Sequence, residues 1–396
     1  MCGLFPSILP PFIKIVNTPV LPQTVIPVLF LYALTLAGAP SPSIQAILAV
    51  DGEGKGSEAA ARAWKELAGG KASTIPQLLQ AMDDANGLSM NWLRSAVDAI
   101  AGRDPKAVPL AALEKFLADK SHNPKARRLA YELIAGAKPA RAMSLINGLL
   151  NDPSVELRRD AVQEVLDRAD KTKSAELYRK ALDAARDLDQ INAARDALDE
   201  LGGKVDLPRH FGFLMHWKVI GPFDNTDRKG FEAVYPPEKN IDFAASHKGK
   251  SGPVKWSELK TADPYGMVDI NEPYGHLKEV VAYAHHSFES ANAVDAEIRL
   301  GCKNAWKIWL NGKLVFERDE YHRGMRIDQY TLPVSLRKGS NEILIKLCQN
   351  EQKESWTDQW QFQLRICDST GTAILASNRP PTPKPKQPTR RPKKRG

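Results

Sequence analysis

The stretch Ala305–Val315, AWKIWLNGKLV, decides the fold of the second half of this chain. Apolar side chains alternate along its first six residues, which is the period of a strand with one buried face. Asn311-Gly312 follows, and these two residue types readily take the positive φ angles of a tight hairpin turn. The stretch therefore predicts two antiparallel strands joined by a two-residue turn.

The same alternation recurs on both sides of this hairpin. Apolar residues occupy every second position of 294–300, 343–347 and 362–366. Turn-forming residues separate these stretches, as in Lys338-Gly339-Ser340-Asn341 and Ser369-Thr370-Gly371. Short strands at this spacing predict an antiparallel β-sandwich.

Two motifs of this half also carry a family resemblance. AWKIWLNGKLV (305–315) and LRKGSNEILIK (336–346) resemble the galactose-binding-like jelly roll found in many carbohydrate-binding modules. The resemblance covers about 275–378, and we assign 211–378 to one module. It implies a jelly-roll sandwich in an exported multidomain bacterial protein and a glycan as its ligand, although such motifs mark a fold rather than a ligand.

Residues 57–202 have a different pattern. They are rich in Ala and Leu, and their apolar residues recur with a 3.6-residue period. A four-residue pattern recurs in this region: arginine, any residue, alanine and an apolar residue. Its copies start at Arg94, Arg128, Arg159 and Arg195, at intervals of 34, 31 and 36 residues. Each copy follows another amphipathic segment, near 74–85, 107–118, 139–150 and 173–186. About four helical hairpins are therefore predicted to stack as an α-helical solenoid.

The third copy resembles a known repeat family. LLNDPSVELRRDAVQEVL (149–166) is similar to the HEAT repeat, with Asp152, Pro153, Val155, Arg158 and Ala161 at its usual positions. The resemblance implies a scaffold that binds a protein partner. We expect the repeated arginines to be exposed or hydrogen-bonded within the array rather than to contact a ligand.

The net charge of +8 is concentrated at one end of the chain. Residues 379–396 hold eight Lys and Arg and no acidic residue, so residues 1–378 sum to zero. A nucleic-acid site on the folded body therefore has no electrostatic basis. The tail is Pro-rich and is expected to be disordered. It either binds an anionic polymer or a membrane surface, or only solvates the chain.

The N-terminus has the pattern of an export signal. Residues 24–39 are uncharged and apolar and end in Ala37-Gly38-Ala39, an A-x-A cleavage pattern. We expect 1–39 to be a signal peptide or an uncleaved anchor, and the mature chain to begin at Pro40. The cysteines Cys302, Cys348 and Cys367 lack zinc-site spacing, and a Cys348–Cys367 bridge is not expected.

Aromatic and polar residues that leave the apolar phase are the candidates for ligand contact, because sugar rings pack on flat aromatic faces. Trp309 lies out of phase with its strand, and the others lie in polar loops or at their edges. The ligand-binding candidates are Trp309, Tyr321, His322, Arg323, Trp356 and Trp360. The alternative is that they cover the second face of the sandwich or pack against the helices.

The sequence carries no recognised catalytic motif. It contains no nucleophile elbow, phosphate loop or metalloprotease helix. Adjacent His285 and His286 would point to opposite faces of a strand, which opposes a shared metal ion. We expect a non-enzymatic protein with no cofactor and no metal. A structural scaffold without sugar binding and an unrecognised glycan-active hydrolase are the alternative functions.

Overall fold

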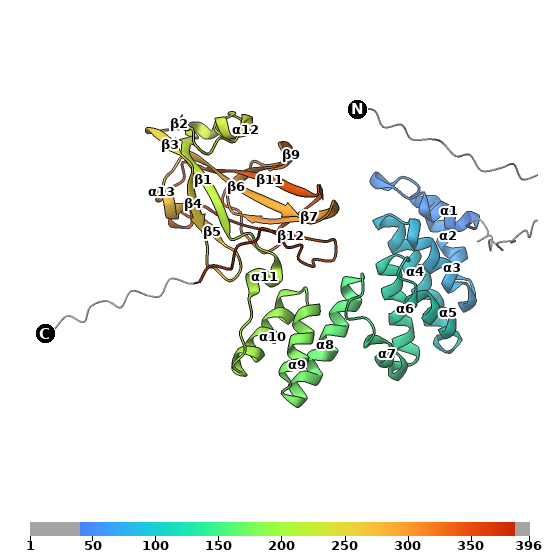
Figure 1. Ribbon diagram of the computed structural model, residues 1–396. Helices are drawn as coiled ribbons and strands as arrows, with labels where there is room; N and C mark the ends of the chain where they lie inside the picture. The colour runs from blue at the N-terminus through green and yellow to red at the C-terminus, as the bar shows by residue number, and fades with distance from the viewer. Residues whose placement is uncertain (1–39, 385–396) are drawn as a thin grey trace, which may run out of the picture. The chain divides into compact units, whose positions relative to one another are not determined.

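A computed structural model describes residues 40–384, in which helices come first and antiparallel strands follow (Figure 1). The predicted signal peptide or anchor (1–39) and residues 385–396 of the predicted tail lie outside the described residues. The described residues from Pro42 onward belong to one compact unit. The order of a helical half and an antiparallel half, expected from the sequence, is confirmed.

The helical half begins at Pro42, earlier than the predicted boundary at residue 57. Its helices are α1 (Pro42–Leu48), α2 (Ser57–Ala68), α3 (Ile75–Ala81), α4 (Gly87–Arg103), α5 (Leu110–Ala118), α6 (Pro124–Ala137), α7 (Pro139–Ile146), α8 (Val155–Thr172), α9 (Ala175–Ala184), α10 (Leu188–Glu200) and α11 (Leu207–Phe211). The four repeated arginines lie in α4, α6, α8 and α10.

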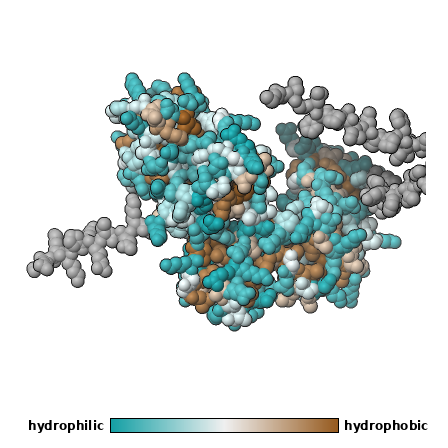
Figure 2. Space-filling view, in the orientation of Figure 1, coloured by the Kyte–Doolittle hydropathy of each residue, from teal (hydrophilic) through white to brown (hydrophobic). Residues whose placement is uncertain are grey.

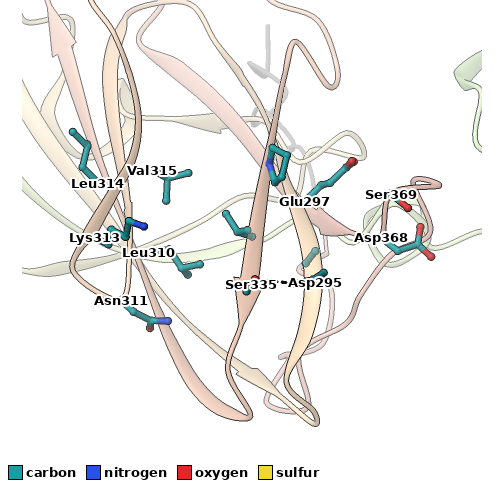
Figure 3. A pocket seen from close by; sticks show the side chains of 13 residues that line it. Asp295, Glu297, Leu310, Asn311, Lys313, Leu314, Val315, Ser335, Asp368 and Ser369 are labelled. Carbon is teal, nitrogen blue, oxygen red and sulfur yellow. Dashed lines mark hydrogen bonds between the residues drawn. The ribbon is translucent and has the colours of Figure 1, made fainter. Parts of the chain in front are cut away.

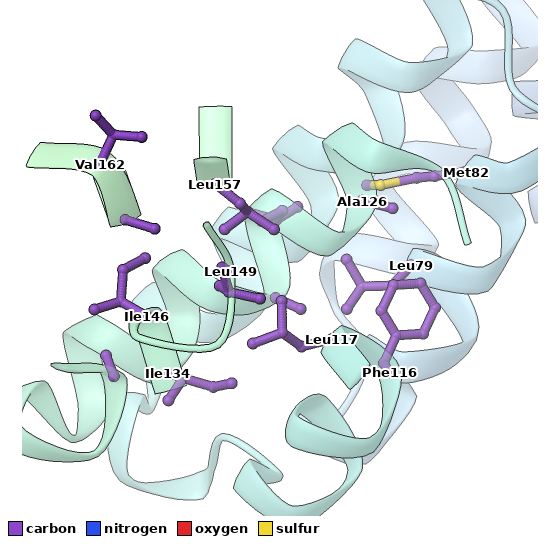
Figure 4. Close-up of a cluster of buried hydrophobic side chains, with 14 of the residues drawn as sticks. Leu79, Met82, Phe116, Leu117, Ala126, Ile134, Ile146, Leu149, Leu157 and Val162 are labelled. Atoms are coloured by element: carbon purple, nitrogen blue, oxygen red, sulfur yellow. The ribbon is translucent and has the colours of Figure 1, made fainter. Parts of the chain in front are cut away.

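Local sequence explains where these helices begin and how they pack. The Asn86 side chain accepts from the backbone N–H groups of Leu88 and Ser89 and so caps α4, as Ser154 caps α8. Ala130 and Ala161, from the repeated pattern, are buried in the seams. Leu, Ile and Phe side chains of successive helices fill the space around such small residues (Figure 4).

A series of ion pairs joins every second helix of this half. Arg94 of α4 pairs with Glu132 of α6 at 2.6 Å, Arg128 of α6 pairs with Asp160 of α8, and Arg159 of α8 pairs with Asp189 of α10 at 2.6 Å. The fourth arginine, Arg195, donates instead to the Tyr265 hydroxyl at 3.1 Å, beyond the helices. The repeated arginines thus link one copy of the pattern to the next.

The second half has two main sheets. Its strands are β1 (His216–Asp224), β2 (Ser246–Lys248), β3 (Pro253–Lys255), β4 (Ser257–Lys260), β5 (Val268–Asp269), β6 (Val280–Ser290), β7 (Val294–Cys302), β8 (Ala305–Leu310), β9 (Lys313–Arg318), β10 (Tyr330–Leu336), β11 (Gly339–Gln349) and β12 (Gln361–Cys367). The short helices α12 (Pro236–Lys239) and α13 (Asn271–Tyr274) lie between strands. One sheet has the order β4-β1-β6-β11-β8-β9, the other β10-β7-β12-β5, and β2 pairs with β3.

The predicted apolar faces form the core of this half. All strand pairs are antiparallel, and β8 and β9 form the predicted hairpin, with φ of 53° at Asn311 and 78° at Gly312. The even-numbered apolar residues of β7, β8 and β12 and the odd-numbered ones of β11 join one buried cluster. Val294 is the exception, since it begins its strand and is 40% exposed.

The outer face of the six-stranded sheet is covered by residues 225–256, which the sequence did not reveal. Lys346 on β11 is fully buried and holds part of this covering segment against the sheet. Its ammonium donates to the carbonyls of Phe231 and Ala233 at 2.9 and 2.6 Å and to the Glu238 carboxylate at 2.9 Å. All three donors of the lysine are therefore satisfied, as burial of a charge requires.

Candidate functional site

Three of the six predicted ligand-binding residues meet at one end of the sandwich. Tyr321 and His322 lie in the loop after β9, and Trp356 lies in the loop after β11. The ring centroids of His322 and Trp356 are 5.5 Å apart, with the rings perpendicular. The Tyr321 hydroxyl accepts from the Asn225 amide at 3.2 Å. The loops that follow three different strands thus converge here.

Trp356 is the most exposed aromatic residue of this group, with 59% of its surface accessible. It sits in the tight turn Ser355–Thr357, whose last residue is fully buried. The Thr357 carbonyl accepts from the Gln349 amide at 2.9 Å and from the Lys278 ammonium at 3.1 Å. These hydrogen bonds therefore fix the turn, while the indole remains exposed to solvent.

Charged pairs lie in the loops next to this indole. The Arg228 guanidinium donates to the Glu351 carboxylate at 3.0 Å and lies 5.3 Å from the centre of the Tyr321 ring. The hydrogen bond from Arg228 lowers the pKa of Glu351 to about 2. Lys278 pairs with Asp358 at 3.1 Å. Charged donors and acceptors therefore lie in the same loops as Tyr321, His322 and Trp356.

His322 belongs to the same site, and its ring is held by a hydrogen bond. Burial lowers its pKa below the ordinary value, more than the hydrogen bond to Asn350 raises it. Its Nε2 atom lies 2.6 Å from the Asn350 side-chain oxygen. An Nε2–H donor with a fixed acceptor defines the tautomer and the orientation of the ring against Trp356.

Buried amides hold these loops together, and sequence reasoning missed them. Asn225, Asn304, Gln349 and Asn350 are each at most 1% exposed. Asn225 donates to the Gln349 carbonyl at 2.9 Å, and Asn304 donates to the Gln349 side chain at 3.2 Å. Amide side chains are common in exposed loops, so only their position after a strand could have hinted at burial.

The other three predicted residues have different surroundings. Trp309 is half-buried on the outer face of the six-stranded sheet, between Leu344 and Leu314 of the flanking strands. Arg323 is exposed and pairs with Glu320 at 2.7 Å. Trp360 is 0% exposed and packs in the core between the sheets, so its prediction as a ligand contact is wrong.

A second candidate is a groove of about 840 Å³ between the edge strands β9 and β10. Figure 3 shows Leu310, Leu314 and Val315 on one side and Asp295, Ser335 and Asp368 on the other. The acidic residues already have partners: Asp295 accepts from Ser335 at 2.8 Å, Glu297 pairs with Arg299, and Asp368 accepts from Thr370. No aromatic residue lines the described groove.

Within residues 40–384, no group of three or more His, Cys, Asp or Glu is arranged to hold a metal ion. In the same range, no helix is both long enough and apolar enough to cross a bilayer. Figure 2 shows a largely hydrophilic face with hydrophobic residues in separate areas.

Comparisons with known proteins give only distant likenesses. No family model and no curated protein matches the chain. Among solved structures, a β-glucosidase from Kluyveromyces marxianus in complex with glucose shares 11% identity over 38% of this chain, with a TM-score of 0.24. A PA14 sugar-binding domain from an RTX adhesin shares 12% identity over 41% of this chain and all of its own, with a TM-score of 0.22.

The α-xylosidase Xac1773 from Xanthomonas citri is a third, with 10% identity over 39% of this chain and a TM-score of 0.20. The chain spans only 15% of the length of the β-glucosidase and 16% of that of the α-xylosidase. These neighbours are carbohydrate-active or sugar-binding proteins, but likenesses this weak carry no argument about function.

Proposed function

We propose that this chain is an exported, non-catalytic binding protein whose sandwich binds carbohydrate at Trp356. The observation that carries the proposal is an indole that is 59% exposed on a turn fixed by buried hydrogen bonds. A large apolar ring contributes little to folding when water surrounds it. Held in place, it offers a flat surface on which the C–H face of a sugar ring packs.

The groups around the indole suit the hydroxyls of a sugar. Arg228 and Lys278 are donors, Glu351 and Asp358 are acceptors, and all four lie in the loops that converge on Trp356. The Arg228–Glu351 pair is about half exposed and therefore weak, so a ligand can share it at small cost. Such a shallow, wet site predicts an affinity of roughly micromolar to millimolar, about 4 to 8 kcal/mol.

A glycan array tests this proposal. The protein used should end at Lys384, because six further cations in 385–396 would bind acidic glycans by charge alone. The proposal expects one or a few related glycans to bind with little dependence on salt. Absence of binding to every neutral and acidic glycan would contradict it and leave the sandwich as a structural module.

We also propose that the helices form a HEAT-like solenoid that binds a protein partner. Support comes from the series of ion pairs that links α4, α6, α8 and α10 in the same sense. In addition, Leu88, Val155 and Leu188 are 48%, 51% and 42% exposed, each in the first turn of one of these helices. Apolar residues at matching positions of a repeat suit a shared contact surface.

Pull-down from the native host tests this surface. The triple variant Leu88→Ser/Val155→Ser/Leu188→Ser should lose the partner that the wild type captures. Met143→Ser, which changes an equally exposed residue of α7, should retain it. Equal capture of the partner by both variants would refute the proposed contact surface.

The proposal of export is based only on the sequence of residues 1–39. These residues lie outside the described part of the chain. We propose cleavage after Ala39, so N-terminal sequencing of protein from the native host should begin at Pro40. Intact Met1 on cytosolic protein would refute export.

A further inference from the structure

A hollow of about 400 Å³ lies where the last helices meet the start of the second half. It is lined by α9, α10, residues 203–206, α11 and Leu375. We propose that this hollow binds an anionic polysaccharide chain, one that carries sulfate or carboxylate groups. This site is separate from the Trp356 site, and its test is independent of that proposal.

Three exposed cations line the hollow without acidic partners. Arg179, Lys204 and Arg209 have no carboxylate within 4 Å among residues 40–384. The arginines that link the helices differ, since Arg94 and Arg159 both have such partners. Cations that lack a protein partner keep their full attraction for an external anion.

The acids near these cations compensate them only in part. Asp206 keeps its negative charge but is fixed in place, because both of its oxygens accept from the Thr382 hydroxyl, at 3.0 and 2.9 Å, and one also accepts from the Arg209 backbone N–H. Asp183 is the other acid of the lining. Arg186, half-buried beside it, donates to the Asp183 carbonyl at 2.8 Å and has no carboxylate within 4 Å among the described residues. Cationic groups therefore outnumber acidic ones around the hollow.

The root of the basic tail lies at the same place. Thr382 binds Asp206, and the Arg379 guanidinium donates to the carbonyls of Pro208 and Phe213 at 3.1 and 2.8 Å. Beyond Lys384 the sequence adds six Lys and Arg and no acid. A long polyanion seated in the hollow therefore begins next to the most basic segment of the chain, which adds attraction along its length.

The walls favour a polysaccharide over a membrane. Leu182, Leu198, Val205 and Leu375 line the hollow together with the cations. Apolar walls suit the C–H faces of sugar rings, while the cations suit their sulfate or carboxylate groups. A flat bilayer surface meets only the rim of a concave site.

The test measures binding to dextran sulfate, with neutral dextran as the uncharged probe and phosphatidylserine-containing vesicles as the membrane probe. The protein ends at Lys384, so that the hollow is tested apart from residues 385–396. The variant is Arg179→Glu/Lys204→Glu/Arg209→Glu. Its matched control is Arg62→Glu/Lys65→Glu/Lys71→Glu, which reverses three exposed charges on and near α2.

We expect the shortened protein to bind dextran sulfate in a salt-dependent manner and to ignore neutral dextran. The variant should weaken binding roughly tenfold or more, and the control less than about threefold, with melting temperatures unchanged in both. If both triple variants weakened binding equally, dextran sulfate would bind by non-specific charge attraction, and the proposed site would be overturned. No binding to dextran sulfate, or binding to vesicles alone, would overturn it as well.

Discussion

At the scale of single residues, the most consequential contact in the helices is the buried ion pair of Arg127 and Asp152. Both side chains are 0% exposed, and two hydrogen bonds of 2.6 and 2.8 Å join them. Asp152→Ala would leave a buried, uncompensated guanidinium, so we expect a loss of about 3 to 5 kcal/mol in the free energy of unfolding. Urea denaturation measures this loss. Arg141→Ala, which removes the exposed pair with Glu114, should leave the unfolding midpoint close to that of the wild type.

Two partly buried histidines, His210 and His286, predict a loss of stability in mild acid. Burial lowers the pKa of both His210 and His286 from 6.5 to about 4. Between these values the unfolded chain binds a proton at each histidine and the folded chain does not, so stability falls as the pH drops through 6.5 toward 4. From pH 7.5 to 5 the loss should be about 2 kcal/mol for each histidine.

Urea denaturation at these two pH values checks this expectation. The variant His286→Gln should reduce the pH dependence by the share of this one histidine, about 2 kcal/mol between the two pH values. Equal stability of the wild type at pH 7.5 and 5 would contradict the burial of these rings.

The tryptophans show what the sequence could and could not indicate about the site. Trp360 shares the even-numbered phase of Phe362, Leu364 and Ile366, so extending the strand by one step would have predicted its burial. Trp309 does point away from the core, as its phase predicts, but residues 225–256 cover much of that face. Trp356 lies in a loop, where alternation predicts nothing.

At the scale of elements, the repeated alanines make the sharpest claim about the helices. Ala130 and Ala161 are 0% and 1% exposed in the middle of α6 and α8. Replacing either by Arg should destabilise the helical half by about 1 to 3 kcal/mol or more, because the larger side chain forces neighbouring helices apart. Thermal melting measures this effect. Ala112→Arg, on the exposed face of α5, is the control and should melt like the wild type.

Strand phase was predictable from the sequence, but strand pairing was not. The buried positions of β7, β8, β11 and β12 follow from alternation. From β4 to β8 and from β9 to β12, consecutive strands nevertheless alternate between the two sheets. Cys348 and Cys367 therefore lie in different sheets, and no disulfide joins the cysteines of residues 40–384. The local alternation of residues determines which face of a strand is buried, whereas long-range packing determines which strands pair with it.

At the scale of the whole molecule, the stretch 201–206 should be the preferred site of proteolysis. Leu201, Gly202, Lys204 and Asp206 are exposed there, between α10 and α11. Limited digestion should leave two resistant fragments. The fragments should co-elute under native conditions, because Arg195 and Asn192 bind Tyr265 at 3.1 and 2.7 Å across the cut. Cleavage spread throughout α2 to α10 would contradict two folded parts.

The central claim, that the sandwich binds carbohydrate on Trp356, is tested most directly by calorimetry with the best glycan from the array. Wild type, Trp356→Ala and Leu314→Ala are compared in protein ending at Lys384, since Leu314 lines the groove between β9 and β10 and is 42% exposed. The proposal predicts that Trp356→Ala loses about 1 to 3 kcal/mol of binding free energy with an unchanged melting temperature, while Leu314→Ala binds like the wild type. Unchanged binding by Trp356→Ala, or loss only in Leu314→Ala, would contradict it.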